Sequence, residues 1–142
     1  MYKLYVFARS DLDSMTPGKL AAQVAHAASQ AARDAYASGE SSLAAVAYSE
    51  WEKSANGFGT TIVKDGESLG DIVYTEAVAG NLVPTALDYA DPLMTGVVHD
   101  PSYPVRDGEH IHLIPLDTCY WAFEDTERNK AFADYVATFN LY

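Results

Sequence analysis

A row of polar side chains recurs at helical spacing between residues 17 and 37. Its members are separated by four, three, four and three positions, so they share one face of a helix. They are Lys19, Gln23, His26, Gln30 and Arg33. Two cations and an imidazole in one row could bind an anion and transfer a proton. We therefore expect this helix to line a cleft; the alternative is an ordinary solvated helix face.

The residues around this row predict the strand and the helix that position it. Tyr2 to Ala8 alternates and is rich in aromatic and β-branched residues, which predicts a strand buried in a sheet. Thr16 is a good N-cap and Pro17 suits the first helical position, so a helix over Pro17 to Ala37 is predicted. Its other side would pack on the sheet through Leu20, Val24, Ala27, Ala28, Ala31 and Ala35. The helix N-terminus, with Lys19 in its first turn, would suit an anion.

The segment from Arg9 to Ala27 resembles the amino-terminal motif of the archaeal/eukaryotic-type peptidyl-tRNA hydrolases, the Pth2 family. The matching positions are Arg9, Asp11, Leu12, Met15, Gly18, Lys19, Ala21, Ala22, Gln23, His26 and Ala27. One extra residue lies between Leu12 and Met15, a change that a loop tolerates. Downstream segments can fill the family's order of elements: Leu43 to Lys53 with Trp51, Thr60 to Lys64, Leu69 to Ala79, Leu82 to Pro84, and Gly96 to Asp100.

The family's second motif, Asp-Ala-Gly-x-Thr-Gln followed by Pro-Gly-Thr, is altered in this chain. The strand ending His99-Asp100 is the best match to its strand and aspartate, with Asp88 as a rival, and Gly108 matches the later glycine. The Thr-Gln pair is absent, and Glu109 stands where the family has a threonine. The resemblance therefore implies a catalytic aspartate at Asp100 inside a rewritten loop. An equal alternative is that Asp100, which Pro101 follows, simply ends a strand and starts a turn.

The resemblance implies hydrolysis of the ester bond of peptidyl-tRNA, without a cofactor. We expect Asp100 to orient or activate water, with His26 as a possible intermediary, and Lys19 to hold a phosphate or the developing oxyanion. His26 has an equal alternative as a structural histidine that ties the helix to the sheet. The expected substrate-binding residues are Arg9, Asp11, Gln23, Arg33, Tyr103 and Glu109. Gln23 would meet the substrate backbone, and Arg33 the tRNA acceptor stem.

The predicted fold class is α/β, a three-layer α/β/α sandwich around a four-stranded mixed sheet, in a single domain over residues 1–142. Besides the first strand and helix, the expected elements are a helix over Ser42 to Ser54, a strand over Thr60 to Lys64, a helix over Leu69 to Ala79, strands over Gly96 to His99 and His110 to Leu116, and a helix over Thr126 to Phe139. Tyr120, Trp121 and Phe123 would follow the last strand as core or as an edge lid. The loop from Thr85 to Thr95 could hide a short strand.

Composition favours a soluble, cytoplasmic protein. Of the 142 residues 49% are hydrophobic, which suffices for one core, and no apolar run is long enough to cross a membrane. The single cysteine, Cys119, excludes an internal disulfide and is expected to be a buried small hydrophobe. Together with His99, Asp100, His110 and His112 it could be considered a metal ligand, but the spacing matches no standard zinc pattern, so no metal is expected.

The net charge of −11 contrasts with the basic surface of most nucleic-acid-binding proteins. A local basic patch could still form, because Lys3, Arg9, Lys19 and Arg33 all lie in the first strand and helix. We expect tRNA as the partner and a monomer or homodimer. Two alternatives remain open: a catalytically silent module whose acidic surface binds a basic protein, and a hydrolase of another acyl or peptidyl ester.

Overall fold

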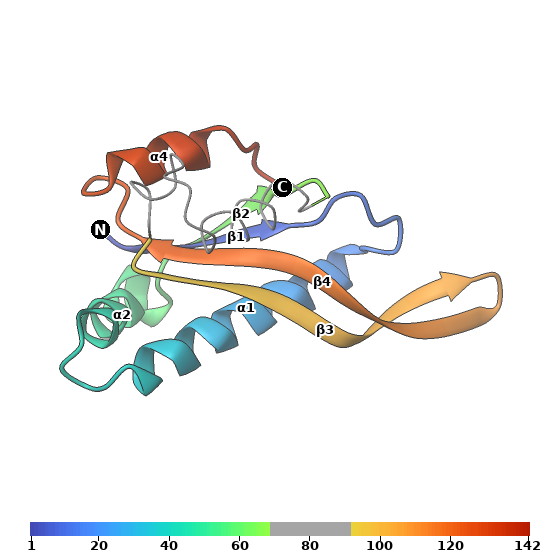
Figure 1. The fold of residues 1–142 in the computed structure, drawn as a ribbon, viewed down its shortest axis with the longest axis horizontal. Coiled ribbons are helices and arrows are strands. Elements are labelled where there is room, and N and C mark those ends of the chain that lie inside the picture. Colours follow the sequence, from blue (N-terminus) through green and yellow to red (C-terminus); the bar gives the residue numbers. More distant parts are fainter. Residues whose placement is uncertain (69–91) are drawn as a thin grey trace, which may run out of the picture.

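The computed structural model describes residues 1–68 and 92–142 and shows an α/β fold built on a four-stranded mixed sheet, as predicted (Figure 1). The elements are β1 (Lys3–Ala8), α1 (Pro17–Ala37), α2 (Leu43–Lys53), the 3-10 helix η1 (Ala55–Gly57), β2 (Thr61–Asp65), β3 (Met94–Asp107), β4 (His110–Glu124) and α4 (Lys130–Ala137). The strand order is β2-β1-β4-β3, with β1 parallel to β2 and antiparallel to β4. The predicted helix Leu69 to Ala79, the Leu82 to Pro84 turn and Asp88 lie outside the described residues.

Helices cover both faces of the sheet because side chains alternate along its central strands. On one face, Leu4, Val6, Trp121 and Phe123 form a buried cluster with residues of α1 and α2. On the other face, Tyr5, Phe7, Tyr120 and Ala122 pack against Phe132 and Val136 of α4. Figure 1 shows α1 and α2 on one side of the sheet and α4 on the opposite side.

Helix α1 begins and ends where the sequence predicts, because its signals are local. Thr16 is the N-cap, and its side-chain oxygen accepts a hydrogen bond from the backbone N–H of Lys19. Three alanines on its inner side, Ala27, Ala31 and Ala35, are fully buried. Such small side chains let the helix backbone approach the sheet closely, which brings the polar side chains of α1 within reach of β3 and β4.

Strands β3 and β4 are much longer than predicted. The sequence predicted strands over Gly96 to His99 and His110 to Leu116, whereas the two form a hairpin over Met94–Asp107 and His110–Glu124. The Asp100-Pro101 pair does not end β3. Because β3 is an edge strand and its register shifts between Asp100 and Tyr103, it accommodates a residue without an N–H group.

The aromatic residues near the end of the chain lie in the sheet rather than after it. Tyr120, Trp121 and Phe123 lie in the carboxyl-terminal part of β4, where it pairs with both β1 and β3, and they are buried. They are therefore core residues, and the alternative of an edge lid is wrong. The closing helix is also shorter than the predicted Thr126 to Phe139, because the chain first turns about Asp125 before Asn129 caps α4.

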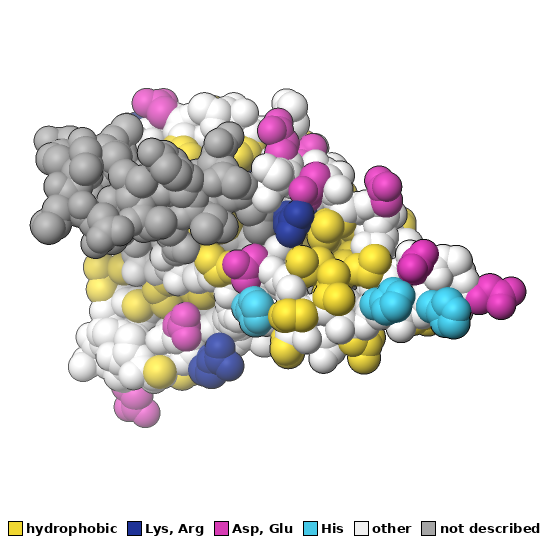
Figure 2. All heavy atoms as spheres, turned by 45° about the vertical axis from the view of Figure 1, so that its right-hand side comes forward, with side chains coloured by type: hydrophobic (Ala, Val, Ile, Leu, Met, Phe, Trp, Pro, Cys, Tyr) yellow, Lys and Arg dark blue, Asp and Glu magenta, His cyan; other side chains and the backbone are white. Residues whose placement is uncertain are grey.

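The hairpin of β3 and β4 extends beyond the rest of the sheet (Figure 1). Its outer part exposes Ile111 and Leu113, which are 60% and 65% accessible. Figure 2 shows hydrophobic and histidine side chains on this part of the surface and acidic side chains at its tip. No helix in the described parts of the chain has the length and apolar character needed to cross a membrane.

Candidate active site

The polar row of α1 lies beside the edge strand β3. Its second member, Gln23, is only 3% exposed and is part of the packed interface between α1 and the sheet. The prediction that the polar row and the apolar face take opposite sides of the helix is therefore wrong at this position. The two faces adjoin, since Ala27, one turn further on, is also buried. Gln23 consequently contacts other protein groups rather than an open cleft.

A chain of two short hydrogen bonds connects β4, α1 and β3. The hydroxyl of Thr118 donates to Oε1 of Gln23 at 2.7 Å, and Nε2 of Gln23 donates to Oδ2 of Asp100 at 2.8 Å. Thr118 is fully buried. Because its hydroxyl occupies the carbonyl end of the Gln23 amide, the amide N–H₂ end is turned towards Asp100. Gln23 therefore holds the Asp100 carboxylate in place, and the sequence prediction missed Thr118 altogether.

The surroundings of Asp100 favour its ionised form. Partial burial acts to raise the pKa of Asp100, but hydrogen bonds from the Ser102 backbone N–H and from Gln23, together with the charges of His26 and His99, outweigh burial and lower it. The Ser102 N–H donates to Oδ1 at 2.9 Å. Each carboxylate oxygen thus has a fixed donor. At neutral pH Asp100 is an oriented anion that can accept a further hydrogen bond or a proton.

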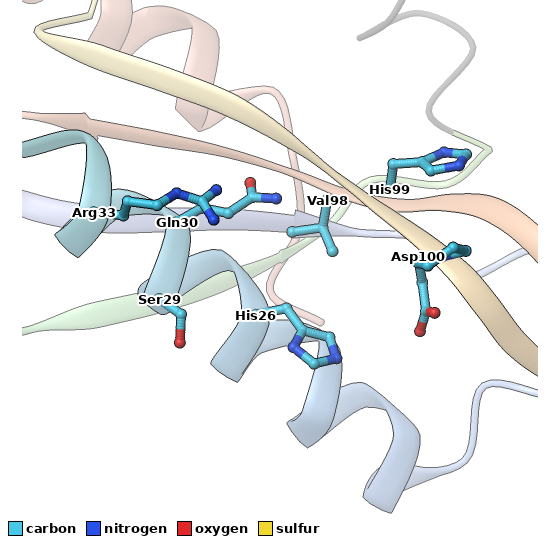
Figure 3. A pocket seen from close by; sticks show the side chains of 8 residues that line it. His26, Ser29, Gln30, Arg33, Val98, His99 and Asp100 are labelled. Carbon is cyan, nitrogen blue, oxygen red and sulfur yellow. The ribbon is translucent and has the colours of Figure 1, made fainter. Parts of the chain in front are cut away.

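An open pocket of about 330 Å³ lies between α1 and β3. It is lined by His26, Ser29, Gln30, Arg33, Val98, His99, Asp100 and Pro101. Figure 3 shows the His26 ring and the Asp100 carboxylate extending into the space between the two elements, whereas the His99 ring lies on the other side of β3. Nδ1 of His99 is 2.7 Å from Oδ1 of Asp117. The structure therefore brings together three predicted site residues, His26, Arg33 and Asp100.

Lys19 lies one turn before Gln23 and faces the base of the projecting hairpin. Its Nζ donates to the backbone oxygen of Pro104 at 2.7 Å and lies 5.4 Å from the centre of the Tyr103 ring. Tyr103 is fully buried, and its hydroxyl accepts a hydrogen bond from Ser14 at 3.2 Å. Tyr103 therefore anchors the loop before α1 to β3, and its ring is not presented to a substrate. Lys19 keeps two further N–H groups for a ligand.

Arg9 and Asp11 neutralise each other. The guanidinium donates through Nε and Nη2 to the two carboxylate oxygens at 2.8 and 2.7 Å. This pairing raises the pKa of Arg9 and lowers the pKa of Asp11. Nη1 also lies 3.4 Å from the backbone oxygen of Asp117. The pair thus connects the end of β1 to β4, and neither residue lines the pocket beside Asp100.

Glu109 lies in the turn between β3 and β4, at the exposed tip of the hairpin. Since the chain runs about 3.3 Å per residue in a strand, this tip is roughly 20 Å along β3 from Asp100. The structure does not bring Glu109 to the pocket. The long hairpin of β3 and β4 keeps this position away from the aspartate.

Metal ligation has no support in the arrangement of side chains. Among residues 1–68 and 92–142, no three His, Cys, Asp or Glu side chains are grouped so as to hold a metal ion. Cys119 is fully buried, as expected of a small hydrophobe, and burial raises its pKa to about 12. Its thiol is therefore neutral and lies within the sheet. The pocket is lined by an imidazole and a carboxylate, His26 and Asp100, which are groups able to take part in acid–base chemistry.

A comparison with known families gives a match that includes all of α1. The family model of peptidyl-tRNA hydrolase PTH2 matches residues 2–87, which is more than half of the chain. The chain belongs to the peptidyl-tRNA hydrolase PTH2 family. The match contains Lys19, Gln23 and His26 but ends before β3, so Asp100 and Thr118 lie outside it. A comparison with curated proteins finds no match.

Membership in the PTH2 family supports a peptidyl-tRNA hydrolase function at the level of the family. The matched residues include α1, which carries the amino-terminal half of the site. The other half is supplied by β3 and β4, which lie beyond the matched residues. The Thr118–Gln23–Asp100 chain joins these halves through hydrogen bonds.

Proposed function

We propose that this chain hydrolyses the ester bond of peptidyl-tRNA, releasing free tRNA and peptide, at the pocket between α1 and β3. The observation that carries the proposal is the ionised Asp100 carboxylate, held by Gln23 and Ser102 at the pocket and faced by His26. A fixed carboxylate beside an imidazole can orient a water molecule and accept its proton.

In the proposed reaction, the oxygen of this water attacks the ester carbonyl carbon. Asp100 accepts the water proton, either directly or through His26, and the bond between the carbonyl carbon and the ribose oxygen breaks. The leaving ribose oxygen takes up the proton that Asp100 or His26 accepted, and the peptide acid releases its remaining proton to solvent, so the products are a peptide carboxylate and a free hydroxyl on the tRNA. Such an ester is an activated bond, and positioning with acid–base assistance is sufficient chemistry.

Lys19 is proposed to stabilise negative charge at the hairpin side of the site. One of its N–H groups is held by the Pro104 backbone oxygen, which fixes the ammonium beside β3. The remaining N–H groups, together with the N-terminus of α1, would receive the developing oxyanion or a phosphate. Gln23, which was predicted to bind the substrate, instead has a positioning role because both ends of its amide are already engaged inside the protein.

Binding of tRNA to a chain of net charge −11 has to rely on a local group of donors. The pocket provides one, since Arg33 and His26 line it and Asp100 is its sole carboxylate among the lining residues. At physiological salt, the repulsion between the RNA and the acidic side chains of the protein is largely screened at separations beyond about 8 Å. We therefore expect weak binding that depends on this pocket rather than on a broad basic surface.

The test is release of the blocked amino acid from N-acetyl-aminoacyl-tRNA by the wild type, without added metal. Asp100→Asn and His26→Gln should each lower kcat by about 100-fold or more, since each removes an acid–base group. Asp107→Asn and His112→Gln make the same chemical changes on the exposed hairpin and should retain activity. Both control side chains are well exposed, at 82% and 58%.

Activity that survives Asp100→Asn would contradict the proposed mechanism. Absence of turnover by the folded wild type over a range of salt would instead favour a catalytically silent member of the family. The loss of the family's Thr-Gln pair and the net charge of −11 motivate that second candidate, a module that binds a basic protein. Its binding would weaken as salt is raised.

A further inference from the structure

The indole of Trp121 crosses from the sheet towards α1. Trp121 is fully buried in β4 and is paired with Gly96 of β3. A Cβ atom at Gly96 would lie only 2.6 Å from Nε1 of the indole. The absence of a side chain at Gly96 therefore makes room for the ring across β3, and this places Nε1 beside the polar row of α1.

This indole fixes the amide of Gln30. Nε1 of Trp121 donates to Oε1 of Gln30 at 2.9 Å. An indole nitrogen can only donate, so it selects the carbonyl end of the amide and leaves the N–H₂ end turned away. Among the residues that the structure describes, Nε2 of Gln30 has no recorded partner, and Gln30 lines the pocket. A buried side chain thus orients two free donors at a ligand-accessible surface.

Arg33 follows Gln30 by one helical turn and lines the same pocket. Its side chain is exposed, and within residues 1–68 and 92–142 it makes no ion pair. Figure 3 shows Gln30 and Arg33 both extending from α1 towards β3, at the end of the pocket away from Asp100. This end of the pocket therefore presents an uncharged pair of N–H groups and a free guanidinium.

From this arrangement we infer that Gln30 and Arg33 form a subsite for a phosphodiester group of the RNA 3′ end, with Trp121 fixing the donor face of Gln30. Phosphate oxygens only accept hydrogen bonds, and they match a guanidinium fork beside an amide N–H₂. A peptide would offer its own N–H donors as well, and neither Gln30, whose oxygen is held by the indole, nor Arg33 supplies an acceptor for them. The inference rests on the proposed function, because it places the nucleic acid beyond Asp100 and the ester at Asp100.

The test measures equilibrium binding of the full chain to deacylated tRNA and to a short acceptor-end RNA duplex with the 3′ overhang. Neither ligand contains the ester, so this result is independent of turnover. Gln30→Glu keeps an acceptor for the indole but places a negative oxygen where the N–H₂ group was. We expect it to raise Kd by about tenfold or more at low salt. Arg33→Gln should weaken binding similarly and reduce the salt slope by about 1.

The matched control is Ala25→Glu, which adds the same charge to an exposed position about 140° around α1. It should leave the Kd nearly unchanged. If Gln30→Glu and Ala25→Glu weaken RNA binding equally, the effect is one of net charge and the subsite is refuted. Unchanged affinity in Gln30→Glu refutes it as well, even if the ester is hydrolysed. Inorganic phosphate bound as tightly as the RNA duplex would identify a free-phosphate site and overturn the RNA assignment.

Discussion

The Thr118–Gln23–Asp100 chain predicts a specific pattern in a double-mutant cycle. Thr118→Val keeps the shape of the side chain but removes the hydroxyl that donates to Gln23 at 2.7 Å. Because Gln23 is 3% exposed, its carbonyl oxygen would then be buried without that donor. We expect the free energy of unfolding to fall by about 1–3 kcal/mol, the usual cost of such an unsatisfied group. This corresponds to roughly 3 °C in Tm per kcal/mol for a chain of this size.

The second substitution in the cycle is Gln23→Met, which removes the amide and keeps similar volume. Combined with Thr118→Val it leaves no unsatisfied carbonyl, so the double variant should be more stable than the sum of the two single losses predicts. The assay is urea unfolding followed by fluorescence of the two buried indoles, those of Trp51 and Trp121. Stability losses that simply add, or a Thr118→Val variant as stable as the wild type, would refute the hydrogen-bond chain as described.

The cycle also separates folding from the proposed chemistry. The double variant lacks the amide that donates to Asp100 at 2.8 Å, so the pKa of Asp100 should rise towards its ordinary value although stability is largely restored. We therefore expect low hydrolytic activity in a stable protein. Titration of the Asp100 carboxyl by NMR checks the pKa without any need for turnover. Thr118→Ser, which keeps the hydroxyl, should retain the wild-type pKa.

Three further results are expected. Gly96→Ala should destabilise the fold by about 1–3 kcal/mol, because its Cβ would lie 2.6 Å from the indole; urea unfolding that matches the wild type would contradict this packing. Tyr103→Phe should loosen the loop before α1 by removing the hydroxyl bonded to Ser14, which faster hydrogen exchange in residues 10–16 would show. Finally, Asp11 and Asp100 have folded pKa values below 3.8, so their stabilisation is present above that pH and is lost as the pH falls through the lowered values. The urea midpoint should therefore decline below about pH 4, and a flat profile would refute the pKa directions.

Residues close together in the sequence were enough to predict α1 and the site residues that it carries. The start of α1 follows from Thr16 and Pro17, which act within a few residues of that helix end, and the alanines after them favour its continuation. The spacing of Lys19, His26 and Arg33 then follows from helix geometry alone. The same reasoning misplaced Gln23 relative to the core, because periodicity does not show how far a sheet extends beneath a helix.

The hairpin could not be predicted because its extent depends on pairing between distant segments. Asp100-Pro101 favours a turn when read locally, yet β3 continues past it as an edge strand with irregular register. The same continuation places Tyr103 in the core and moves Glu109 to the hairpin tip. The family motif, matched by residue order along the chain, predicted both Asp100 and Glu109 as site residues. In the structure Asp100 lines the pocket and Glu109 does not.

The sequence by itself determined the fold class, the helix that carries the polar row and the family, since these depend on local propensity and on residues close together in the chain. Tertiary structure alone decided which atoms of that row face the pocket. Thr118 and Trp121 are 95 and 91 residues from the side chains they orient, Gln23 and Gln30. Each offers a donor from the sheet, and an amide held against that donor turns its oxygen to it. The direction in which the amide N–H groups of Gln23 and Gln30 point is therefore set by the packing of α1 on the sheet.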